Sequence, residues 1–170
     1  MNRSPVACPD WLINYFKDAG GVLSFAEYMD LALNHPLFGS YSSGKINIGK
    51  HGDFVTSPSL SSDFAELLSV QVLEWLKQLS AFSSNSEKIA LIEIGPGEGH
   101  LSFDLIKALQ RKSPHILQKI ELILVEVNNS MRQRQFHKLA KLSNLNMSWK
   151  TLDQLAKDPP LGVVIAHEVL

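Results

Sequence analysis

Three glycines at alternate positions, Gly95, Gly97 and Gly99, constrain the fold of this chain more than any other feature. The six residues before them, 89–94, are mostly apolar and predict a short buried strand. An amphipathic helix is expected just after them, at about 100–111. Glycines allow positive φ angles and let the backbone approach a ligand without an intervening Cβ. A strand, a glycine-rich turn and a helix start are typical of α/β proteins that bind nucleotide-like ligands.

The chain after residue 89 alternates strictly between strand and helix patterns. Further strands are expected at 120–127, 145–149 and 163–166, separated by a helix at 130–142 and a polar helical turn at 152–157. Such alternation predicts a parallel sheet with helices on both faces. The expected fold class is therefore α/β, with an N-terminal helical portion followed by the first half of a doubly wound, mainly parallel, Rossmann-like sheet.

The N-terminal half shows helix signals instead. One helix is expected from Asp10 to the glycines at 20–21, and a second begins at a capping box formed by Ser24 and Glu27. A long amphipathic helix is expected at about 60–79, and a hairpin around 41–48. We expect an N-terminal helical, substrate-side region at 1–82 and a partial domain at 88–170. The serine-rich stretch 81–88 is the expected connection.

Composition excludes several function classes. A hydrophobic content of 45% with 19% charged residues describes a globular chain, and a net charge of −1 gives no electrostatic case for a nucleic-acid partner. No apolar run approaches the ~20 residues that span a bilayer, so no membrane insertion is expected. The single cysteine, Cys8, allows neither an intrachain disulfide nor a cysteine-built metal site, and indicates a reducing, cytoplasm-like compartment.

The two ends of the chain carry their own expectations. Residues 1–5 do not resemble a signal peptide or a mitochondrial presequence. An apolar strand pattern runs almost to Leu170, where an uncovered apolar end is unusual for a domain. We therefore expect a fragment of a longer protein, which alone could bind its ligand weakly.

The glycine spacing distinguishes between cofactors. The dinucleotide fingerprint places its third glycine three residues after the second, but Gly99 follows Gly97 by two. An acidic residue two before the first glycine, here Glu93, followed by G-x-G-x-G is instead the pattern of methyltransferases that use S-adenosylmethionine. A carboxylate near the ammonium group of that ligand is electrostatically favourable. The turn Gly95-Pro96-Gly97-Glu98-Gly99 is thus a candidate cofactor site; a turn that only permits tight packing is the alternative.

Glu126 lies at the carboxyl end of the second predicted strand. A carboxylate at that place can accept hydrogen bonds from both ribose hydroxyls of a nucleotide-like ligand. The alternative is a solvated strand end. Because the carboxyl ends of parallel strands share one edge, we expect Gly95, Glu126 and the pair His167-Glu168 at the same edge.

Several motifs, in order, resemble the MidA-type methyltransferases, relatives of the mitochondrial complex I assembly methyltransferase. They are His35-Pro36-Leu37-Phe38-Gly39 with Tyr41; Gly52-Asp53-Phe54-Val55-Thr56-Ser57-Pro58 with Phe64 and Glu66; residues 91–97; Glu126 with Arg132 and Gln135; and residues 166–170. Three positions depart from the family pattern: Ser59 replaces the usual glutamate, Ala65 a glycine and His167 an asparagine. The resemblance covers nearly the whole chain, although family members are roughly twice as long.

The resemblance implies a class I methyltransferase fold, S-adenosyl-L-methionine as cofactor and protein arginine N-methylation, with support for assembly of a respiratory complex I-like enzyme. It also implies a mitochondrial location for eukaryotic relatives. A cationic arginine with a very high pKa needs a carboxylate to hold it and receive its proton. The catalytic candidates are Glu168 first and Asp53 second. The alternative for Asp53 is turn capping with Thr56 and Ser57.

Two other functions stay open at this point. One is a non-catalytic assembly or interaction module that keeps the fold to bind S-adenosylmethionine. The other is an NAD-binding oxidoreductase, which the glycine spacing disfavours. The sequence does not predict the oligomeric state or the protein substrate.

Overall fold

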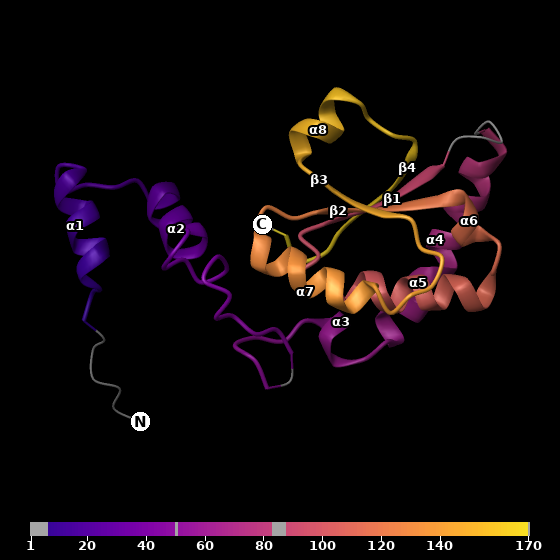
Figure 1. The fold of residues 1–170 in the computed structure, drawn as a ribbon, viewed down its shortest axis with the longest axis horizontal. Coiled ribbons are helices and arrows are strands. Elements are labelled where there is room, and N and C mark those ends of the chain that lie inside the picture. The colour runs from indigo at the N-terminus through magenta and orange to yellow at the C-terminus, as the bar shows by residue number, and fades with distance from the viewer. Residues whose placement is uncertain (1–6, 50, 83–87, 170) are drawn as a thin grey trace. The chain divides into compact units, whose positions relative to one another are not determined.

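The computed structural model describes residues 7–49, 51–82 and 88–169 (Figure 1). It divides into two compact units, Met1–Ser43 and Gly44–Leu170. The division falls well before the expected boundary at residue 82, because helix α4 (Asp63–Phe82) packs on α5 (His100–Lys112) and shares its core. Residues 1–5, most of the serine-rich connection and Leu170 lie outside the described residues.

The first unit contains helices α1 (Asp10–Asp18) and α2 (Phe25–Asn34). The expected capping box is confirmed, since the Ser24 hydroxyl accepts from the Glu27 amide at 3.2 Å and Glu27 Oε2 accepts from the Ser24 amide at 2.8 Å. The rings of Trp11, His35 and Phe38 lie with centroids 4.9–5.0 Å apart.

Of two expectations for the segment between α2 and the sheet, one is wrong and the other is confirmed with shifted bounds. The hairpin around 41–48 does not form among the described residues, where turns occur and Ile48 makes an isolated parallel bridge to Phe54. The long helix expected at about 60–79 forms as α4, shifted by three residues, and a short helix that was not expected, α3 (Ser57–Leu60), precedes it. They are separated because Ser61 is extended and its hydroxyl accepts from the Asp63 amide at 3.3 Å, a local bond that competes with helix continuation.

The second unit is built on a four-stranded sheet in the order β3-β2-β1-β4, with all neighbours parallel. The strands are β1 (Ile89–Ile94), β2 (Ile120–Val125), β3 (Met147–Lys150) and β4 (Gly162–Ala166). Ile94 of β1 pairs with Val125 on one side and Ala166 on the other, so three strands end at the same level. The expected α/β fold with a parallel sheet is confirmed.

Helices cover the two faces of this sheet unequally. Helices α4, α5, α6 (Ile116–Lys119) and α7 (Asn129–Leu139) lie on one side in Figure 1, and α8 (Leu152–Lys157) lies on the other. The larger core cluster joins α4 and α5 to alternate strand residues such as Leu91 and Leu122. A smaller cluster on the opposite face contains Ile92 and Ile123 with Leu155 of α8. Period-two strand burial places these residues on opposite faces.

No helix among the described residues has the length and apolar character to cross a membrane.

Candidate functional site

The glycine-rich loop joins β1 to α5 at the carboxyl edge of the sheet. Gly95, Gly97 and Gly99 have φ angles of 63°, 52° and 77°. The Gly95 amide donates to Val125 O at 3.1 Å, which ties the loop to the end of β2. Gly99 is the N-cap of α5 and supplies no side-chain cap. The loop therefore presents backbone groups and an uncapped helix start, which suit a ligand bearing a carboxylate.

Packing inside the protein also restricts the side chain at two of these glycines. A Cβ at Gly95 would lie 2.8 Å from Val169 Cγ2, and one at Gly97 would lie 3.0 Å from Ile48 Cδ1. At Gly99 the nearest atom would be Gln135 Cγ, at 3.5 Å. The alternative of a packing turn is therefore supported at Gly95, so the glycines alone do not identify a ligand site.

Glu93 is a buried carboxyl beneath the loop. Its side chain is 5% exposed, and the Ser102 hydroxyl of α5 donates to its Oε2. Burial raises the pKa of Glu93 to about 7, against the opposing effect of the Ser102 hydrogen bonds. This carboxyl therefore exchanges a proton near neutral pH, at the end of the strand that carries the loop.

Glu126 follows β2 and is held in one orientation. Its Oε1 accepts from the Asn128 amide at 2.8 Å, and its Oε2 accepts from Gln135 Nε2 at 3.2 Å. Burial raises the pKa of Glu126, whereas these hydrogen bonds and the charge of Arg132 oppose the rise. Asn128 also begins α7, since its Oδ1 accepts from the Ser130 amide at 2.9 Å.

Gln135 of α7 brings Glu126 and the glycine loop together. Its Nε2 also donates to Gly97 O at 2.7 Å, and its Oε1 accepts from Trp149 Nε1 at 2.7 Å. The spacing of residues in the sequence did not predict these contacts. The only sequence signal for Gln135 was its place, with Glu126 and Arg132, in one of the motifs that resemble the family.

Arg134, the neighbour of Gln135, holds a distant segment against the same loop. Its Nη1 donates to Glu98 Oε1 at 2.9 Å and to Ile46 O at 2.7 Å, and its Nη2 donates to Gly44 O. The Ile48 amide donates to the same Glu98 oxygen at 3.5 Å. The covering segment, defined here as residues 44–49 and 51–54, is thus joined to the glycine loop through Arg134 and Glu98.

Asp53 lies in the covering segment in a local turn. Its Oδ2 accepts from the Asn47 amide at 2.9 Å, and its own amide donates to Asn47 O at 2.8 Å. This resembles the capping role considered as the alternative, but the partner is Asn47; at the start of α3, Thr56 pairs with Ser59 instead. Among the described residues, Asp53 makes no hydrogen bond or ion pair with Glu126 or Glu168, so its catalytic role stays a prediction.

Glu168 lies just beyond β4, on the edge that also carries Gly95. Its φ angle is 55°, a left-handed conformation that costs an L-residue about 1–2 kcal/mol. Its side chain is 51% exposed, with Oε1 at 3.8 Å from His167 Nε2. The His167 ring packs on Phe64 at 4.8 Å. Backbone strain of this kind concentrates at functional sites.

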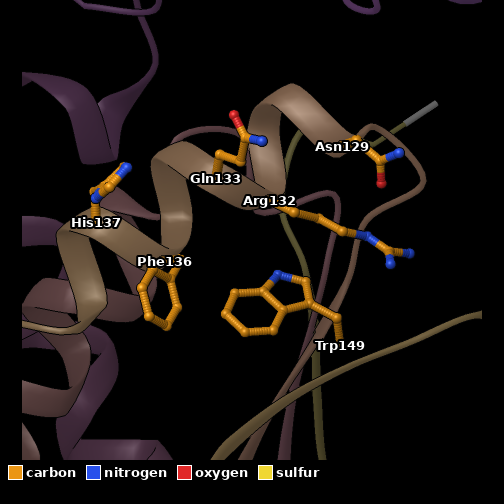
Figure 2. A pocket seen from close by; sticks show the side chains of 6 residues that line it. All are labelled: Asn129, Arg132, Gln133, Phe136, His137 and Trp149. Atoms are coloured by element: carbon orange, nitrogen blue, oxygen red, sulfur yellow. The ribbon is translucent and has the colours of Figure 1, made fainter.

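A groove of about 400 Å³ lies between α7 and β3 (Figure 2). It is lined by Asn129, Arg132, Gln133, Phe136, His137 and Trp149. The rings of Phe136 and Trp149 have centroids 6.4 Å apart. None of the predicted cofactor-binding residues lines this groove, which shares only Trp149 with the Gln135 contacts. Among the described residues, no group of three His, Cys, Asp or Glu side chains is arranged to hold a metal ion.

A family model described as "Putative S-adenosyl-L-methionine-dependent methyltransferase" matches residues 67–170. The chain is 36% identical over 119 residues to the mitochondrial protein arginine methyltransferase NDUFAF7 of Danio rerio, covering 69% of this chain and 27% of that protein. The Homo sapiens protein of the same name is 32% identical over 123 residues, covering 71% and 26%. The chain therefore spans about a quarter of these relatives.

A solved structure extends the comparison to the fold. It is a protein from Burkholderia thailandensis, described as a likely methyl transferase and bound to S-adenosyl-homocysteine, with 28% identity and a TM-score of 0.73. The match covers 98% of this chain and 44% of that one. The sequence matches and this structure agree with the family and the fold that the motifs predicted.

Proposed function

The chain belongs to the S-adenosyl-L-methionine-dependent methyltransferase family matched above, and from this membership we propose that it binds S-adenosyl-L-methionine at the carboxyl edge of β1 and β2. The residues assigned to the cofactor are Glu93, Gly95, Pro96, Gly97, Gly99 and Glu126. The reaction proposed is methyl transfer to an arginine side chain of a protein, the activity that the names of the curated relatives state for those proteins.

One observation carries the proposal: the Glu126 carboxylate and the Gly97 carbonyl share the Gln135 amide as a donor. This shared donor holds Glu126, the proposed acceptor for the ribose hydroxyls, beside the glycine loop. The carboxylate accepts hydrogen bonds from the amides of Val127 and Asn128 and from Gln135, and an ionised carboxylate has about four acceptor sites. The carboxylate can therefore still accept a hydrogen bond from the ribose hydroxyls.

When bound, the cofactor supplies a methyl group on a sulfonium, and the protein must align the acceptor and exclude water. Glu168 is the first proposed carboxylate for an arginine acceptor because it lies at the same strand edge as the loop and holds a strained backbone conformation. Asp53 is the second, because its segment contacts the glycine loop through Ile48 and Glu98. Residues 1–82 are proposed to lie on the substrate side.

Cofactor binding is tested by isothermal titration of the full chain with S-adenosyl-L-methionine. Glu126→Ala is expected to weaken binding at least about tenfold, because it removes charged hydrogen-bond acceptors. Glu74→Ala, on the outer surface of α4, is the matched control and binds as the wild type does. Equal affinity of Glu126→Ala and wild type, or selective binding of NADH, contradicts the cofactor assignment.

Methyl transfer is tested with tritiated cofactor and a protein extract, followed by identification of the labelled residue. Glu168→Ala is expected to bind cofactor normally and lose transfer, with Asp53→Ala tested in parallel. Full methyl transfer by both variants would contradict the catalytic roles proposed for Glu168 and Asp53. Cofactor binding by wild type without any transfer favours the non-catalytic binding module.

The biological setting is also proposed. A role in assembly of a complex I-like enzyme follows from the family resemblance, and pull-down of labelled subunits tests it. A cytoplasmic location suits the exposed free thiol of Cys8, whereas the names of the eukaryotic relatives state a mitochondrial one for those proteins. Cell fractionation separates the two.

A further inference from the structure

We propose that Gln135 is a positioning residue for the cofactor: its side-chain amide fixes the Glu126 carboxylate and the Gly97 carbonyl in the spacing that one ligand can contact. The inference rests on the proposed function, because the ligand is S-adenosyl-L-methionine. It adds a residue from α7 that touches both halves of the cofactor site without itself contacting reacting atoms.

The orientation of the Gln135 amide is determined by its partners. Trp149 Nε1 can only donate a hydrogen bond, so the amide oxygen must face it at 2.7 Å. The NH₂ group must then face Gly97 O at 2.7 Å and Glu126 Oε2 at 3.2 Å. The reversed amide would place two donors together and two acceptors together, which is unfavourable at every contact.

Burial makes this arrangement rigid. Gln135 is 0% exposed, so water cannot replace a lost partner, and both amide hydrogens and the oxygen are in use. The amide spans the loop after β1, the end of β2 and the middle of β3. A ligand that contacts both the glycine loop and Glu126 therefore meets groups that are already in place, which reduces the ordering cost of binding.

Four groups favour the ionised form of Glu126. They are the amides of Val127 and Asn128, the side chain of Gln135 and the charge of Arg132. Three are hydrogen-bond donors to the carboxylate, and Arg132 lies on the same helix as Gln135. Because each favours the ionised form, removal of the Gln135 donor raises the pKa of the carboxyl further and leaves fewer ionised acceptors for a ribose.

The first test uses Gln135→Met, which keeps the length of the side chain and removes all three hydrogen bonds. Isothermal titration with S-adenosyl-homocysteine is expected to show affinity lower by roughly tenfold than wild type. Gln133→Met, an exposed position on the same helix, is the matched control and keeps wild-type affinity. Thermal unfolding of each variant verifies that it is folded.

A spectroscopic readout reports the contact without any ligand. In a background with Trp11→Phe and Trp75→Phe, Trp149 is the only tryptophan. Gln135→Met in that background is expected to shift Trp149 emission to shorter wavelength, because the indole N–H loses its acceptor. Gln71→Met, at an exposed position of α4 that does not line the groove, leaves the emission unchanged.

The second test uses Gln135→Glu, which has the same shape. When protonated, its carboxyl can donate to the Glu126 carboxylate, and when ionised it repels it. The affinity of this variant relative to wild type is therefore expected to rise as pH falls from 8 to 5.5. Taking the ratio to wild type at each pH cancels the titration of Glu93. A packing defect alone lowers the affinity equally at every pH.

The outcomes separate this inference from the proposed function. If wild type binds neither S-adenosyl-homocysteine nor S-adenosyl-L-methionine, the proposed function fails and the inference fails with it; the Trp149 emission then reports only on the hydrogen bond. If wild type binds and both Gln135 variants bind equally well with a flat pH ratio, the positioning role is overturned while the function stands. Weaker binding by Gln135→Met together with the rising ratio of Gln135→Glu supports it.

Discussion

At the scale of single residues, Glu93 destabilises the fold when it is ionised, and it lies near the end of the strand that carries the glycine loop. Glu93 is 5% exposed, and its carboxyl accepts hydrogen bonds from the hydroxyl and the backbone amide of Ser102. A carboxylate in such surroundings favours its protonated form. A ligand ammonium nearby would favour the ionised form, so the proposed binding of such a ligand would release a proton from Glu93 near pH 7.

This burial makes stability depend on pH. The pKa of Glu93 rises from 4.5 to about 7 on folding. The contribution of its protonated carboxyl to the free energy of unfolding is therefore fully present below pH 4.5 and is lost as pH rises through 7. The lost stability amounts to about 3 kcal/mol. Glu93→Gln is expected to remove most of the difference in unfolding free energy between pH 5 and pH 8, measured by urea denaturation. Glu74→Gln retains the wild-type difference; parallel pH profiles for Glu93→Gln and wild type would contradict the prediction.

Glu168 permits a test in which the fold is preserved. Asparagine adopts left-handed φ angles more readily than glutamate. We expect Glu168→Asn to be as stable as wild type or more stable by up to about 1 kcal/mol, and to lose methyl transfer. Thermal unfolding and the transfer assay measure the two effects. A variant that is active and no more stable would show that neither the carboxylate nor the strain matters.

At the scale of elements, the covering segment depends on α7 for its position. Arg134 contributes three hydrogen bonds to Gly44 O, Ile46 O and Glu98. The pair with Glu98 is partly buried, with exposed side-chain fractions of 29% and 19%, so it is less screened than a surface pair.

Loss of Arg134 is therefore expected to release the covering segment. With Arg134→Met, trypsin should cleave after Lys45 roughly tenfold faster, because local opening becomes easier. Mass spectrometry identifies the cut. Arg111→Met is the control, since Arg111 lies in the last turn of α5 and pairs with Glu66, and it leaves the Lys45 rate unchanged. Equal rates in both variants would show that the segment is held by other contacts.

The sequence predicted elements better than contacts. β1 was predicted at its observed bounds because a mostly apolar run ends at a glycine, and α8 was predicted at 152–157 from its polar helical pattern. The break between α3 and α4 was missed because local serine hydrogen bonds interrupt an otherwise continuous apolar pattern. Glycine spacing and Glu126 indicated the cofactor edge. Gln135 and Arg134 were not predicted as bridging residues, because their partners lie 9 to 90 positions away.

At the scale of the molecule, every contact described for the cofactor site lies in the second unit, Gly44–Leu170. A chain beginning at Gly44 is therefore expected to bind S-adenosyl-homocysteine within about threefold of the full chain's affinity, a difference of less than 1 kcal/mol. Isothermal titration of both chains measures it, and circular dichroism verifies that the shorter chain is folded. Loss of binding by a folded shorter chain would assign part of the site to the first unit.

The long reach of Arg134 has a consequence for the order of folding. The contacts of the proposed cofactor site all join residues between positions 93 and 149. In contrast, Arg134 donates hydrogen bonds to backbone carbonyls that lie 88 and 90 positions earlier in the chain. Doubling such a separation adds only about 0.6 kcal/mol of closure entropy, but contacts between distant residues form late. The amides of the covering segment should thus exchange with deuterium sooner than those of β1, and a folding chain should complete its ligand cradle before the covering segment closes over it.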